Sequence, residues 1–228
     1  MLLLIPRDRQ CLRGCASSKG MFDSKDEKPL GTNEKLKQQI LFLKEIDNLK
    51  QIFRQTVLTK DRRQENDAEH SWHLAMLTIV LSEYSNVGSF DLLKTVKMTL
   101  IHDIVEIDAG DTFCYDVHDR MMKVGKEREA AHRIFSILPE EQAKEFINLW
   151  EEFEARDTPE ARFAAAVDRL QPLLLNFYSE GHAWREHGVK KSQVIERNHH
   201  IEKGSVELWR FAEALINESV EEGYLLGE

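Results

Sequence analysis

Four ionisable side chains stand out in the sequence, three of them in apolar surroundings. His102 and Asp103 are neighbours within a stretch of leucine, isoleucine and valine, and Asp168 follows three alanines and a valine. His70 lies near the start of a further stretch with helical spacing. Buried charged groups are usually paired or bound to a metal, because burying them alone is costly. Two imidazoles and two carboxylates form a nitrogen and oxygen ligand set that suits Mn, Co, Fe, Ni or Zn.

Glu106 strengthens this interpretation of the apolar stretch. It lies three residues after Asp103 and four after His102, so a helix brings all three side chains toward one side. A single buried histidine or aspartate is more often satisfied by hydrogen bonds alone. Three polar groups on one core helix instead favour a shared ligand. His73, three residues after His70, is expected to pack or to support the site and not to bind the ion.

The elements that carry these residues are predicted to be helices. Among 228 residues there are only 11 Gly and 5 Pro, too few turn signals for the many short strands of a sandwich or barrel. From Asn33 onward apolar residues recur at spacings of three and four, which predicts amphipathic helices. We expect helices over 33–55, 66–84, 89–110, 119–137 and 139–156, a helix that begins at Pro159, a loop over 181–188, and helices over 191–202 and 204–222. The predicted fold is an all-α, single-domain helical bundle over residues 34–228, with a metal site between core helices.

Local signals mark where several of these helices begin and end. Asn66 and Glu69 form a plausible capping pair at the start of the second helix. Gly110 is a typical C-terminal residue for the third helix. Thr158 as the cap and Pro159 in the first turn predict the start of the helix that carries Asp168.

At these positions the sequence resembles the HD superfamily of metal-dependent phosphohydrolases. The superfamily pattern of His, then His-Asp, then Asp is matched by His70, His102-Asp103 and Asp168. Glu65-Asn66 before His70, and Gly110-Asp111 after Glu106, make it most similar to the short, single-domain 5′-deoxynucleotidases. The resemblance covers roughly residues 34–175 and has no counterpart for the first 30 residues.

This resemblance implies roles for individual residues. The four-residue set would bind one divalent ion (Mn, Co, Mg, Fe, Ni or Zn), and Glu106 and Asp111 would serve the hydrolytic step. Arg54, expected at the end of the first helix, would contact the substrate phosphate. Arg62 or Arg63 could take part of that duty, because the loop after Arg54 is one residue longer than in the relatives.

The expected reaction is metal-assisted hydrolysis of a (deoxy)ribonucleoside 5′-monophosphate to a nucleoside and phosphate. Two alternatives are another HD-type phosphohydrolase or phosphodiesterase, and a non-catalytic helical dimer whose metal is structural. Glu106 and Asp111 favour an enzyme, because a structural metal site needs no additional carboxylates beside it.

Composition excludes several classes of protein. With 31 Lys+Arg against 40 Asp+Glu the formal charge is −9, which argues against a nucleic-acid partner. No apolar run approaches the roughly 20 residues that a spanning helix needs, so no membrane association is expected. Cys11, Cys15 and Cys114 cannot all pair and lack zinc or redox spacing, which predicts a reducing, cytoplasmic location.

Two further expectations concern the ends of the chain and its assembly. Residues 1–33 mix basic residues with Ser and Gly without helical periodicity, and we expect a disordered N-terminal extension. We also expect a homodimer, because dimers are common in the resembled family and because Phe146, Leu149, Trp150 and Phe153 form a wide apolar stripe on one helix.

Overall fold

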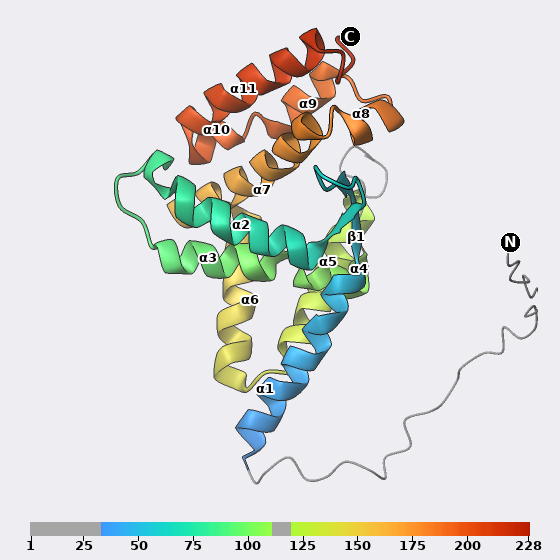
Figure 1. Cartoon of the computed structure of the whole chain (residues 1–228). Helices are drawn as coiled ribbons and strands as arrows, with labels where there is room; N and C mark the ends of the chain where they lie inside the picture. The colour runs from blue at the N-terminus through green and yellow to red at the C-terminus, as the bar shows by residue number, and fades with distance from the viewer. Residues whose placement is uncertain (1–32, 111–119) are drawn as a thin grey trace, which may run out of the picture. The chain divides into compact units, whose positions relative to one another are not determined.

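The computed structural model describes residues 33–110 and 120–228, and most of them are helical (Figure 1). The elements in chain order are α1 (Glu34–Glu45), the 3-10 helix η1 (Ile46–Gln51), β1 (Phe53–Val57), β2 (Gln64–Asn66), α2 (Asp67–Leu81), η2 (Ser82–Tyr84), α3 (Leu92–Ile101), η3 (His102–Val105), α4 (Glu106–Ala109), α5 (Arg120–Phe135), α6 (Glu140–Ala155), α7 (Pro159–Tyr178), α8 (His182–Glu186), α9 (Lys191–Asn198), α10 (Ile201–Gly204) and α11 (Val206–Glu221). The all-α prediction is confirmed. Within the described ranges, strands occur only as the small antiparallel pair β1 and β2.

The predicted end of the first helix at Gln55 is wrong. The helix α1 ends at Glu45, and residues 53–57 form the strand β1 instead. Aromatic and β-branched residues in this segment favour an extended backbone. The strand pairs with β2, and the Leu58 N–H donates to the Arg63 carbonyl at 2.9 Å where the chain turns back.

Two further elements differ from their predictions. The third helix is not continuous, because α3 ends at Ile101 and residues 102–105 form the tighter 3-10 helix η3 before α4. The expected loop over 181–188 contains the short helix α8. The first change matters for function, since His102 and Asp103 therefore lie at a break between two helices.

The predicted helix boundaries near the candidate site are confirmed. Asn66 and Glu69 form a reciprocal capping box at the start of α2. The Thr158 hydroxyl accepts a hydrogen bond from the Ala161 N–H at the start of α7. Gly110 ends α4 with a positive φ of 76°, which a residue with a Cβ adopts only with strain. Local sequence thus fixes where α2 and α7 begin.

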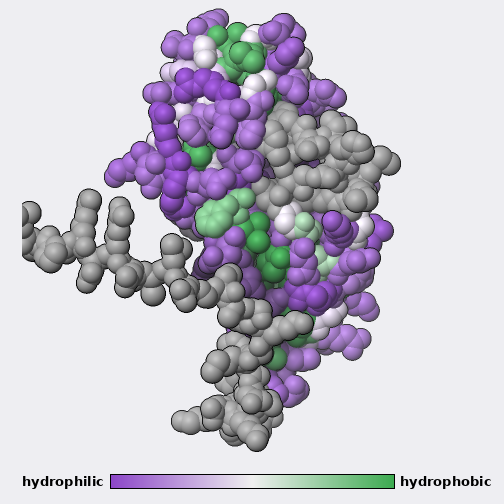
Figure 2. All heavy atoms as spheres, turned by 90° about the vertical axis from the view of Figure 1, so that its right-hand side faces the viewer, coloured by the Kyte–Doolittle hydropathy of each residue, from purple (hydrophilic) through white to green (hydrophobic). Residues whose placement is uncertain are grey.

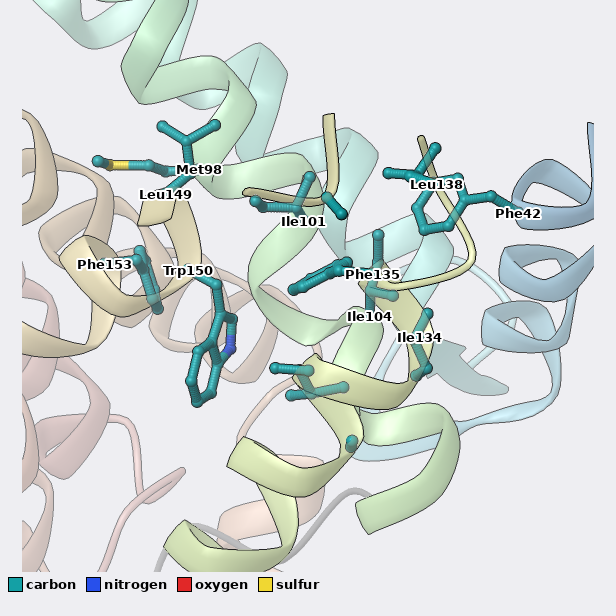
Figure 3. Packing of buried hydrophobic residues seen from close by; sticks show 14 of the residues in the cluster. Phe42, Met98, Ile101, Ile104, Ile134, Phe135, Leu138, Leu149, Trp150 and Phe153 are labelled. Carbon is teal, nitrogen blue, oxygen red and sulfur yellow. The ribbon is translucent and has the colours of Figure 1, made fainter. Parts of the chain in front are cut away.

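The buried apolar residues form two clusters. The first lies among α1, η3, α5 and α6 and is shown in Figure 3, with Phe135 and Ile134 fully buried. The second joins α2, the later part of α7 and the C-terminal helices α8 to α11. Helix α7 contributes residues to both clusters, Ala161 and Ala164 to the first and Phe163 and Val167 to the second. Its buried small residues allow neighbouring helices to approach closely on both sides.

The apolar stripe on α6 is part of the first cluster. Leu149, Trp150 and Phe153 are buried within this chain, and Phe146 packs against them. Using this stripe as an argument for a dimer interface is therefore wrong, since its side chains are already covered. The predicted extension over residues 1–33 lies, except for Asn33, outside the described residues.

The surface shown in Figure 2 is mostly hydrophilic, with small groups of hydrophobic residues between. Among the described residues, no helix combines the length and apolar character needed to cross a lipid bilayer.

Candidate metal centre

The structure brings together the side chains of His70, His102, Asp103 and Asp168. They come from the first turn of α2, from η3 and from the middle of α7. His70 Nε2 lies 3.2 Å from Asp168 Oδ1 and 3.7 Å from Asp103 Oδ2. His102 Nε2 lies 3.1 Å from Asp103 Oδ1 and 3.6 Å from Asp168 Oδ1. Two nitrogens and two carboxylates thus surround one buried point between three elements.

Hydrogen bonds on the far side of each imidazole orient it toward this point. His70 Nδ1 lies 3.1 Å from Gln171 Oε1, and His102 Nδ1 lies 3.0 Å from the Thr99 carbonyl oxygen. Both oxygens can only accept, so each Nδ1 carries a proton, and in the neutral form of each ring Nε2 is left with a lone pair. Such partners of ligating histidines set the tautomer and the ring orientation.

Burial and charge perturb the ionisation of the four groups. Burial, followed by the charge of Arg54, lowers the pKa of His70 to about 4. Burial also lowers the pKa of His102, but the carboxylates of Asp103 and Asp168 outweigh it and hold that pKa well above the usual value. Burial would raise the pKa of Asp168, whereas Arg169 and the two histidines hold it well below its usual range. Without a metal, the charge of two buried carboxylates is therefore balanced in part by a proton on His102.

This donor set fits a divalent cation. His102 Nε2 is buried and makes no hydrogen bond of acceptable geometry with any residue in the described ranges. Neighbouring donors around an ion with metal–ligand distances of about 2.1 Å are separated by about 3 Å, close to the spacing observed. A cation would replace the additional proton on His102 and bind His102 Nε2. When bound here, it would supply Lewis-acid chemistry and lower the pKa of a water molecule.

Glu106 and Arg54 lie against the same centre. Carboxylate oxygens of Asp67, Asp103 and Glu106 lie within 4.8 Å of one another, and Glu106 is buried. Arg54 Nη1 donates to Asp103 Oδ2 at 2.9 Å and to Asp67 Oδ1 at 3.0 Å. Arg54 reaches this position from β1 and not from a helix end, so its placement by the sequence was wrong although its proximity to the aspartates fits the expected role.

The two alternative arginines bind other carboxylates. Arg63 pairs with Glu69, and Arg62 Nη2 lies 2.9 Å from Glu180 Oε2. Both pairs are on the surface, whereas the Arg54 side chain is largely buried. Of the three arginines, Arg54 is therefore the one that contacts the centre. Asp111 lies outside the described residues, so its role stays a prediction.

Sequence reasoning assigned no role to Gln171, Glu65 or Asp67. The side chain of Gln171 is fully buried and donates from Nε2 to Glu65 Oε1 at 2.6 Å, while its oxygen faces His70. Burial raises the pKa of Glu65 to about 7, against the opposing effects of Arg54 and Gln171. Gln171 follows Asp168 by three residues on the same helix. That spacing was the available signal, because it brings the two side chains to one face of α7.

His73 supports the site and does not bind at its centre. Its Nδ1 lies 3.3 Å from Gln171 Nε2, the atom that also donates to Glu65. The prediction for His73 as a supporting residue agrees with this position.

Residues 46–209, more than half of the chain, match the protein family described as HD domain. The chain belongs to the HD domain family. An HD domain relative of known structure, from Magnetospirillum magnetotacticum, is described as a predicted metal-dependent phosphohydrolase. It is 51% identical to this chain with a TM-score of 0.80, and the match covers 84% of this chain and 96% of the relative.

Curated relatives of this HD domain chain are similar at lower identity. The 5′-deoxynucleotidase HDDC2 of Homo sapiens is 28% identical over 134 residues, which cover 58% of this chain and 64% of the human protein. The protein of the same name from Danio rerio is 26% identical over 156 residues, 68% of this chain and 74% of the relative. The chain thus spans less than two thirds of the human relative.

Proposed function

We propose that this chain is a divalent-metal-dependent phosphohydrolase of the cytoplasm that converts (deoxy)ribonucleoside 5′-monophosphates to nucleosides and phosphate. The observation that carries the proposal is the buried convergence of His70, His102, Asp103 and Asp168 with Arg54 bonded directly to Asp103. An anionic substrate needs local positive charge in an acidic protein. The cytoplasmic part rests on the cysteine spacing alone.

In this proposal His70, His102, Asp103 and Asp168 would hold the ion, which when bound would supply Lewis-acid polarisation of a phosphoryl oxygen and a more acidic water molecule. Glu106 accepts the proton of the attacking water, since it is a buried carboxylate beside the ligands that is not needed to complete the set, whereas the other such carboxylate, Asp67, is held by Arg54. Asp111 assists the leaving 5′-oxygen or the water network.

Arg54 binds the substrate phosphate through charge-assisted hydrogen bonds. Its guanidinium is already aligned by Asp67, whose Oδ1 it contacts at 3.0 Å. Asp103 would be one of the residues that hold the ion, and Asp67 would keep the Arg54 side chain in place beside the phosphate.

A phosphate-release screen tests the activity. Purified protein is incubated with each ribo- and deoxyribonucleoside 5′-monophosphate, with Mn, Co, Mg, Fe, Ni or Zn added singly. Release from one or more nucleotides that requires added metal and is lost in Asp168→Asn supports the proposal. If no nucleotide releases phosphate while metal is bound, the alternative of a non-catalytic metal site gains support.

We also propose a homodimer, supported by an exposed apolar stripe on α2. Trp72, Met76, Ile79 and Val80 follow helical spacing and are 65, 42, 48 and 62% exposed. Contiguous exposed apolar surface often marks a protein interface. Light scattering should give twice the chain mass at micromolar concentration, and Val80→Glu should halve it. A monomeric mass for the unmodified protein would contradict the proposal.

A further inference from the structure

A cavity of about 510 Å³ lies beside the turn between α6 and α7. None of the residues proposed for the metal centre lines it. Its basic lining residues are Arg156, Arg162, His200 and Lys203. Ala165 also lines it, three residues before Asp168 on α7, so the Cβ atoms of these two residues are about 5–6 Å apart. The distance from the wall of the cavity at Ala165 to the metal centre at Asp168 is therefore shorter than a nucleotide.

The cavity lining contains three permanently cationic side chains, those of Arg156, Arg162 and Lys203, and one acidic residue, Asp157. Arg162 donates from Nε and Nη2 to the carbonyl oxygens of Arg156 and Asp157 at 3.2 and 3.0 Å, which are neutral acceptors. No ion pair within 33–110 and 120–228 joins a carboxylate to Arg162 or to Lys203. The chain as a whole carries a charge of −9. A concentration of cations in such a protein is unfavourable unless an anion accompanies it.

His200 shows that the positive potential reaches into the pocket. Burial, and then the charges of Arg169 and Arg156, lower the pKa of His200 to about 3. Its ring is neutral near pH 7, and Nε2 lies 3.5 Å from Arg156 Nη1. The pocket thus combines permanent charges with one neutral hydrogen-bonding ring.

The walls of the pocket are held rigidly. A Cβ added to Gly204 would come within 2.4 Å of the Arg162 carbonyl oxygen, so α10 packs directly on α7 and fixes His200 and Lys203 beside Arg162. Arg156 has a left-handed backbone, with φ of 55°, where α6 ends.

From this arrangement we propose that the basic pocket binds a phosphate group. The group is either free inorganic phosphate or a second phosphate of the nucleotide whose 5′-phosphate occupies the metal centre. Tetrahedral oxyanions match several cationic donors converging from different elements. Only the nucleotide source rests on the proposed function.

Lys203 is the residue to change, because it is exposed and no described residue forms an ion pair with it. Lys203→Gln and Lys203→Glu should therefore fold normally. The matched control is Lys144→Gln, since Lys144 is an equally exposed lysine on α6 that does not line the pocket.

Calorimetric titration of inorganic phosphate into the full-length, metal-loaded protein tests the site. We expect a binding event that persists after the metal is removed with a chelator. Lys203→Gln should weaken it about tenfold, the cost of one charge-assisted contact, and Lys203→Glu should abolish it. Lys144→Gln should bind like the unmodified protein. Absence of chelator-resistant binding, or unchanged binding in Lys203→Glu, overturns the proposal.

A comparison of two nucleotides distinguishes the sources of the phosphate. If the pocket takes a second substrate phosphate, a nucleoside 3′,5′-bisphosphate should have a lower KM than the 5′-monophosphate, and Lys203→Glu should remove that difference with little effect on kcat. If it takes the free ion, the two KM values should agree while phosphate binding remains sensitive to Lys203. Chelator-resistant binding without hydrolysis of either nucleotide would refute the proposed function but support the phosphate site.

Discussion

Replacing Gln171 with methionine should weaken metal binding at the candidate centre. Its oxygen lies 3.1 Å from His70 Nδ1, and methionine fills a similar volume without a strong acceptor. Loss of such a partner typically lowers metal affinity about 10–100-fold, or about 1.4–2.7 kcal/mol. An independent value, about 1–3 kcal/mol for leaving a buried donor unsatisfied, agrees with this range. Competition with a chromophoric chelator, well below the unfolding temperature, measures the affinity.

A matched control separates this effect from general destabilisation. Asn198 is also a buried amide, and its Nδ2 donates to the Val194 carbonyl on α9 at 2.7 Å. Asn198→Leu should lower the unfolding temperature but leave metal affinity unchanged, whereas Gln171→Glu is not a suitable control, because it would place a second carboxylate against Glu65. Equal metal affinity in Gln171→Met and the unmodified protein would refute the reasoning that Gln171 orients His70.

Four other outcomes are expected. Glu106→Gln should keep its metal, measured by elemental analysis, while turnover falls on the order of 10²–10⁴-fold; near-normal turnover would contradict its role as base. Arg54→Lys should raise the KM for a nucleoside monophosphate about tenfold, and an unchanged KM would move the phosphate contact elsewhere. Metal uptake near pH 7 should release about one proton, because Asp103 and Asp168 raise the pKa of His102 in the metal-free protein. Calorimetry in buffers of different ionisation enthalpy measures the number of protons released, and a value of zero would contradict the prediction. Burial raises the pKa of Glu65 from 4.5 to about 7, so the stability that its protonated form contributes, up to about 3 kcal/mol, is present below pH 4.5 and is lost as the pH rises through 7. Metal-free Glu65→Gln should therefore melt at a higher temperature than the unmodified protein at pH 8 but not at pH 4. Equal melting temperatures at pH 8 would refute this.

The sequence was sufficient to predict the helical fold and the residues that converge at the centre. Helix starts at Asn66 and Thr158 are local events, decided by a capping side chain within four residues. His102, Asp103 and Asp168 were identifiable because each is polar in an apolar setting, whereas His70 was assigned from its place in the series of His, then His-Asp, then Asp.

What could not be predicted depends on contacts between distant segments. The strand β1 exists because it pairs with β2, and Arg54 points at Asp103 only as a result of that pairing. Glu65 and Gln171 are separated by 106 positions, so their hydrogen bond has no local signature. The stripe on α6 looked like an interface because periodicity does not reveal which element covers it.

Helix α7 has one further consequence, for how this chain can be shortened. One of its faces belongs to the cluster with α5 and α6, and another to the cluster with α8 to α11. A protein cut after Tyr178 would retain His70, His102, Asp103 and Asp168, yet it would expose the apolar side chains of α7 that the C-terminal helices cover. We therefore expect such a truncation to destabilise the candidate centre although it removes none of the four residues that form it.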